Sequence, residues 1–136
     1  MASLDFVFLA EYAKLEPGST ITAVGAGIKG IRPTGDGPAV QLFVAGAVDR
    51  VPGEAEASMT ITIQPETNEY SISQTISMDS APEGLFATTL FAIAVSIPIT
   101  GSGKYNVLVA VDEQLPTAID LWVDTEDASS TLPDGA

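Results

Sequence analysis

Apolar and polar residues alternate with a period of two along most of the chain. Residues 68–78 give the clearest example, because small polar residues separate the apolar ones. The apolar positions of that stretch are Tyr70, Ile72, Ile76 and Met78. Successive side chains of a β-strand point to opposite faces of its sheet, so this alternation predicts half-buried strands. No window of helical length keeps an apolar stripe at helical spacing, and we therefore expect an all-β protein.

About eight such strands follow one another, separated by turn residues. Residues 59–63 and 68–78 are joined by the turn at 64–68, which predicts a hairpin. The remaining strands are expected at residues 4–12, 20–28, 39–48, 85–97, 105–111 and 119–123. Short strands with turn signals roughly every 8–12 residues are typical of an antiparallel β-sandwich, and they also fit a small barrel. We expect the sandwich.

Length and chain ends indicate how the domain is organised. A chain of 136 residues can bury roughly two-thirds of its unfolded surface without disulfides or metals. We expect one sandwich domain over residues 1–125 and a loose acidic tail over residues 126–136. The first residues lack the basic region of a signal peptide, which predicts a cytoplasmic or virion-associated protein.

One uncharged stretch, residues 84–103, is long enough to span a bilayer. Thr, Ser and Pro interrupt it, and several of its apolar residues are β-branched. A strand buried on both faces explains this composition better than a membrane helix, so we expect no membrane insertion.

The charge balance and the missing residue types exclude several functions. The net charge is −13, from 18 acidic and 5 basic residues, and the chain has neither His nor Cys. So acidic a surface repels phosphate backbones, which makes nucleic acid a poor partner. The usual zinc ligands, thiol nucleophiles and the commonest general base are all absent. We expect no enzyme activity, no cofactor and no metal site.

Two glycine-rich motifs resemble nucleotide-binding loops without their context. Residues 25–30 match Gly-x-Gly-x-x-Gly, but prolines and glycines follow at once and prevent the helix that must hold the pyrophosphate. Residues 101–104 resemble the end of a P-loop, yet Pro98 replaces its first glycine and Tyr105 its Ser or Thr. We interpret both motifs as strand ends or turns.

Two acidic loops support an alternative function. Asp112 and Glu113 lie in one predicted loop, and Asp124, Glu126 and Asp127 lie in another. If these loops meet at one end of the sandwich, their carboxylates can supply the six to eight oxygens that calcium prefers. No calcium-loop motif connects them. The alternative hypothesis is a cytoplasmic ligand- or calcium-binding domain.

Several predicted strands carry apolar residues on both faces, whereas a sandwich needs only one apolar face per sheet. The second face is either covered by loops or free to bind a partner. Lys29 and Arg32 either dock an acidic partner or balance local charge. The candidate partner-binding residues are Trp122, Phe43, Val7, Leu9, Lys29 and Arg32.

Residues 4–13, Gly18 and residues 23–28 resemble a family of small uncharacterised bacterial proteins, and so do residues 103–112. Members of that family carry a Gly-x-Tyr strand followed by an acidic turn and a last strand. The resemblance covers most of the chain. It implies an immunoglobulin-like β-sandwich and brings no activity, cofactor or site residues.

The sequence thus favours a non-enzymatic structural or interaction module that acts within a larger assembly. Its expected partner is another protein or further copies of itself. A bacteriophage capsid decoration or accessory protein is the specific form that we expect.

Overall fold

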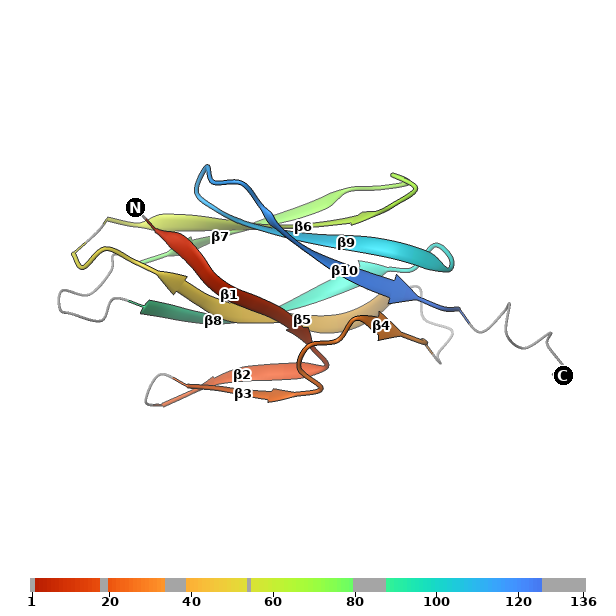
Figure 1. Ribbon diagram of the computed structural model, residues 1–136, viewed down its shortest axis with the longest axis horizontal. Coiled ribbons are helices and arrows are strands. Elements are labelled where there is room, and N and C mark those ends of the chain that lie inside the picture. Colours follow the sequence, from red (N-terminus) through yellow and green to blue (C-terminus); the bar gives the residue numbers. More distant parts are fainter. Residues whose placement is uncertain (1, 18–19, 34–38, 54, 80–87, 126–136) are drawn as a thin grey trace, which may run out of the picture.

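A computed structural model describes residues 2–17, 20–33, 39–53, 55–79 and 88–125 (Figure 1). All regular secondary structure in these ranges is β-strand, which confirms the all-β prediction. The strands are β1 (Ser3–Ala10), β2 (Tyr12–Glu16), β3 (Thr20–Val24), β4 (Gly30–Ile31), β5 (Ala39–Asp49), β6 (Ala57–Pro65), β7 (Ile72–Met78), β8 (Thr88–Pro98), β9 (Gly103–Val111) and β10 (Thr117–Val123). No helix long and apolar enough to cross a membrane occurs in the described ranges.

The strands form three sheets. One has the order β1-β5-β8, a second has the order β4-β10-β9-β6-β7, and β2 and β3 form a separate hairpin. Every pair is antiparallel except β4 with β10. Figure 1 shows the two larger sheets as facing layers, with the β2–β3 hairpin as a further layer below β1-β5-β8.

The main core lies between the two larger sheets. Alternate residues of β9 are buried there, namely Tyr105, Val107, Val109 and Val111. Leu42, Val44 and Val48 of β5 belong to the same cluster from the facing sheet. Each such aliphatic side chain stabilises the fold by about 1.5–3 kcal/mol when fully buried. Along β9 the period-two pattern read from the sequence is therefore the pattern of burial, whereas Ile72, an apolar position of the same pattern in β7, is exposed.

The β2–β3 hairpin explains why some strands are apolar on both faces. Ala10, Ala13 and Ala45 are buried in a second cluster between the hairpin and the outer face of β1-β5-β8. Their small side chains let the hairpin approach the sheet closely. Phe6 and Phe8 lie beside this cluster with parallel rings, whose centroids are 6.3 Å apart. Part of the second apolar face is thus covered by the chain itself.

Three predicted strands are shorter in the structure than in the sequence pattern. The strand expected at 68–78 begins only at Ile72, the first residue of β7. The strand expected at 4–12 is interrupted at Glu11, whose N–H donates to the carbonyl of Val24 (3.0 Å). The strand expected at 20–28 ends at Val24, because Gly25 and Gly27 have φ of +65° and +83°. Such values favour glycine. The Gly-x-Gly-x-x-Gly motif is therefore a turn that leads from the hairpin to β4.

Some predictions concern parts of the chain outside the described residues. They are the turn at Gly18, the loop around Gly35, the start of the strand expected at 85–97, and the tail 126–136.

Candidate functional site

Two neighbouring strands, β7 and β8, each have one edge that pairs with no described strand. Among the described strands, β7 pairs only with β6, and β8 pairs only with β5. Along that edge, each strand presents a row of backbone N–H and C=O groups that form no hydrogen bonds with another described strand. None of the seven residues of β7 and none of the eleven residues of β8 is charged. We call these two strands the β7–β8 side.

Hydrogen bonds at both ends show that β7 and β8 run along the same side of the sandwich. At one end, the Tyr70 hydroxyl donates to the carbonyl of Pro98 (2.5 Å). At the other end, the buried Arg50 guanidinium donates to Thr89 Oγ1 (3.2 Å) and to the carbonyl of Asp79 (3.0 Å). Tyr70 precedes β7 and Asp79 follows it, so the two strands lie antiparallel across the gap between the sheets.

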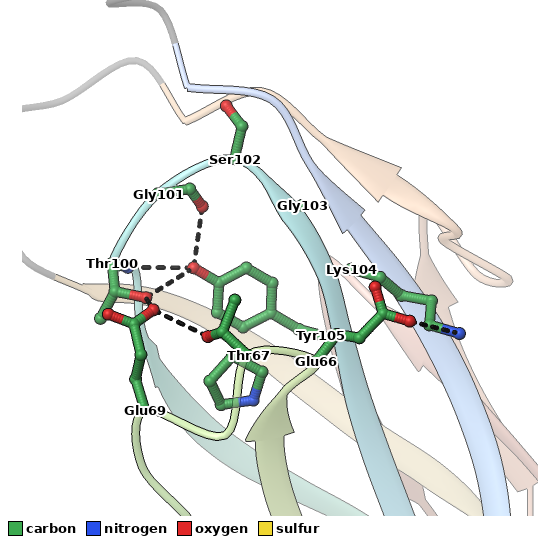
Figure 2. A pocket seen from close by; sticks show the side chains of 10 residues that line it. Glu66, Thr67, Glu69, Thr100, Gly101, Ser102, Gly103, Lys104 and Tyr105 are labelled. Atoms are coloured by element: carbon green, nitrogen blue, oxygen red, sulfur yellow. Dashed lines mark hydrogen bonds and ion pairs between the residues drawn. The ribbon is translucent and has the colours of Figure 1, made fainter.

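A hollow of about 260 Å³ lies at the Tyr70 end of this side (Figure 2). The buried Tyr105 lines it. The Tyr105 hydroxyl donates to the Gly101 carbonyl (2.8 Å) and accepts a hydrogen bond from the Thr100 N–H (2.9 Å). One tyrosine at the start of β9 thus closes the turn that follows β8.

Polar side chains join this turn to the turn between β6 and β7. Glu69 Oε1 accepts hydrogen bonds from Thr67 Oγ1 (2.8 Å) and Thr100 Oγ1 (2.9 Å), as Figure 2 shows. Burial raises the pKa of Tyr70 to about 12, and nearby Tyr105 and Glu69 add to the effect. These groups bond to one another across the two turns. Their arrangement fixes the end of β8 relative to β7.

Three of the predicted partner-binding residues are held inside the fold. Leu9 is 0% exposed, and Val7 packs against the main core. Phe43 packs beneath the hairpin, where Tyr12 meets its ring edge-on with centroids 5.2 Å apart. The residues of β1 that point away from the main core are instead Phe6 and Phe8, on the face of the sheet that the β2–β3 hairpin covers. Leu9 therefore offers no surface to a partner.

The other three predicted residues gather at β4 and β10. Trp122 is 56% exposed and lies beside Gly30 of β4. The backbone N–H of Trp122 donates to the carbonyl of Lys29 (2.9 Å). Arg32 forms an exposed ion pair with Asp124 (2.8 Å), which balances its charge and contributes about 0.2–1 kcal/mol. These residues belong to the other sheet from Val7, Leu9 and Phe43.

The described residues of the two acidic loops lie apart. Asp112 and Glu113 follow β9, whereas Asp124 follows β10, so they lie at opposite ends of β10. Seven residues of strand separate the ends by about 20 Å, at roughly 3.3 Å per residue. Asp112 Oδ1 instead accepts a hydrogen bond from the Ser58 N–H (2.9 Å). The described acidic residues of the two loops therefore do not meet the condition on which the calcium hypothesis depends.

No group of three or more acidic side chains that can hold a metal ion occurs in the described part of the chain. Glu126 and Asp127 lie outside the described residues. The polar groups of the Tyr105 hollow already bond to each other, so their evident role is to brace the two turns.

The sequence contained part of the signal for the β7–β8 side. The uncharged stretch at 84–103 predicts a strand buried on both faces. The structure places β8 at a sheet edge, where Ala94 and Ser96 are exposed. Strand order depends on pairing between distant segments, and no local pattern reports it.

No family model matches this chain, and no curated protein matches it in sequence. The resemblance to a family of small bacterial proteins therefore stays a prediction.

Proposed function

We propose that this protein is a non-enzymatic structural or interaction module that contacts its neighbours in a larger assembly through the β7–β8 side. One observation carries this proposal: two adjacent edge strands lack any charge in a chain whose net charge is −13. Proteins usually protect such edges with charged side chains, prolines, bulges or covering segments. An edge that keeps regular pairing and no charge is suited to accept another strand.

The surroundings of this side support a role in association. β8 pairs with β5 without a register shift over its full length, so its free edge is regular. The Tyr70 and Arg50 hydrogen bonds hold both ends of β8 against the facing sheet. A strand that is already fixed in place loses less conformational entropy when a partner binds.

We also propose that the sandwich is immunoglobulin-like. With β2, β3 and β4 set aside, the order β1-β5-β8 facing β10-β9-β6 corresponds to strands A-B-E facing G-F-C of immunoglobulin sandwiches. β7 is then an added strand next to C, as in variable-type domains. The Tyr105 hydroxyl bonds back to residues 100 and 101, which is the geometry of the tyrosine corner. The hairpin and β4 form an insertion between the first two strands of that scheme.

The specific form that we propose is a decoration or accessory protein of a bacteriophage particle. The acidic charge keeps free copies soluble, while the uncharged side stays available for contact.

Sedimentation of a source lysate, followed by immunodetection of the chain, tests the proposal. We expect the wild-type chain to travel with a particle far heavier than its 14.0 kDa mass. Ala94→Lys places a charge at an exposed position of β8 and should release the chain from the particle.

Ser3→Lys is the matched control, because it adds the same charge at an exposed position of β1. It should leave sedimentation with the particle unchanged. A wild-type chain that runs near its own mass contradicts the proposal, and so does an Ala94→Lys chain that still travels with the particle while folded.

A further inference from the structure

We infer that β8 pairs antiparallel with β8 of a second copy, which joins two β1-β5-β8 sheets into one continuous sheet. This inference rests on the proposed function, because it places the contact on the same β7–β8 side, and it identifies the partner as a second copy of the chain. An antiparallel strand that pairs with itself generates twofold symmetry, the commonest symmetry of protein dimers.

The length of β8 allows a full-length register for this pairing. Ile93 is the middle of Thr88–Pro98, so pairing about Ile93 places every residue of one strand opposite a residue of the other. Phe91 then lies opposite Val95, and both are buried toward the core. Ala92 lies opposite Ala94 on the outer face. The register therefore continues each face of the sheet into the same face of the second copy.

Charge favours a second copy over a charged partner. None of the 18 acidic residues lies on β7 or β8, so two acidic copies meet here without like charges directly opposite each other. A basic protein would find no carboxylate on these strands to pair with. Three of the uncharged outer positions of β8, Ala92, Ala94 and Ser96, are also small and leave room for the side chains of a second strand.

The other edge of the same sheet limits strand pairing to two copies. That edge is β1, whose register against β5 shifts between Leu4 and Phe6. A bulge of this kind bends the strand and disfavours further pairing. Pro98, which lacks an N–H, ends β8 itself. We therefore expect a closed dimer through β8 and no open filament.

Sedimentation velocity of the purified chain over a range of concentrations tests the pairing. The wild-type chain should approach twice its 14.0 kDa mass as concentration rises. Ala94→Lys should raise the dissociation constant at least about tenfold, since the two lysines of a dimer would lie diagonally across the new ladder and repel each other. Ser3→Lys should leave it unchanged. A wild-type chain that stays monomeric at every concentration overturns the inference, as does undiminished dimerisation of Ala94→Lys.

Cross-linking tests the register, because the chain contains no Cys. When Ala92→Cys and Ala94→Cys chains are mixed under mild oxidation, the disulfide should form mainly between the two different variants. Each variant alone places its thiols diagonally, roughly 7–8 Å apart, and should cross-link much more slowly. Equal rates in all three samples contradict the pairing about Ile93.

The two proposals fail in different ways. A purified chain that dimerises through β8 but stays out of any large particle contradicts the proposed function alone. A purified chain that is monomeric, yet enters a particle in a manner sensitive to Ala94→Lys, contradicts self-pairing alone.

Discussion

The two sides of the sandwich differ in how their sheet edges are protected. On the side of β1 and β10, β1 carries Asp5 at a register shift, and β4 pairs along the edge of β10. The Gln114 side chain also donates to the carbonyl of Ala2 (2.5 Å), which ties the start of β1 to the β9–β10 turn. On the β7–β8 side, the two strands themselves carry no charge and no register shift, and no described strand pairs with their free edges.

This difference suggests that the open side is a property of function. Three separate devices protect one side, so this fold is compatible with protected sheet edges. A bulge, an acidic residue and a short added strand are all means by which proteins prevent pairing with other chains. Their absence from β7 and β8 leaves one side suited to bind.

The largest effect that we predict comes from the protected side. A Cβ atom at Gly46 would lie 2.1 Å from the carbonyl oxygen of Phe6 and 2.9 Å from Val7 Cα. Gly46→Ala must therefore push β1 away from β5, because both obstacles are backbone. We expect a loss of about 3 kcal/mol or more in the free energy of unfolding, measured by urea denaturation. An unchanged midpoint would contradict the tight pairing of β1.

A smaller effect is expected at the open side from Tyr105→Phe. The change removes the hydroxyl that bonds to the Thr100 N–H and the Gly101 carbonyl. Groups left without partners inside a protein cost about 1–3 kcal/mol, so stability should fall by that order. The same variant should weaken association, because the turn after β8 is no longer closed. Urea denaturation and sedimentation velocity measure the two effects separately.

Salt concentration should change the affinity between two copies of the chain. Two copies of net charge −13 repel each other, and about 1 M salt screens this repulsion far better than about 0.01 M. Dimerisation through an uncharged edge should therefore tighten severalfold as NaCl increases, as measured by sedimentation. Dissociation at high salt would indicate instead that ion pairs hold the copies together.

The smallest predicted effect concerns alkaline pH. The pKa of Tyr70 is raised from 10.0 to about 12 in the folded protein, so the folded state retains this proton where the unfolded state loses it. The resulting stabilisation is complete below pH 10 and is lost as the pH rises through 12. Denaturant midpoints of the wild type and Tyr70→Phe should converge over this range. Parallel midpoints would show that the Tyr70 proton does not contribute.

The sequence predicted the strands well where alternation decides burial. Residues 39–48 and 105–111 correspond closely to β5 and β9. The alternation predicted one continuous strand through Glu11. At Glu11 the chain instead leaves β1 and enters the hairpin, and the Glu11 N–H donates to the carbonyl of Val24. β4 was missed because its two residues pair only through contact with the distant β10.

The candidate site was less predictable than the fold. The sequence showed that several strands were apolar on both faces, but it could not show that Ala13 and its hairpin cover one of them. It also could not place Val7 and Leu9 on the inward face. A one-residue bulge near Asp5 reverses the alternation, so that the residues after it point to the opposite faces of the sheet from those that a regular strand predicts. Edge position follows from the order of strands, and that order depends on long-range pairing.

Amide hydrogen exchange of the chain, free and in its assembled form, tests the central claim most directly. We predict that assembly slows exchange in peptides from Thr88–Pro98, while peptides from Ser3–Ala10 exchange at the same rate in both forms. Slower exchange at β1 or around Trp122, with β8 unchanged, would contradict the assignment of the β7–β8 side as the contact surface.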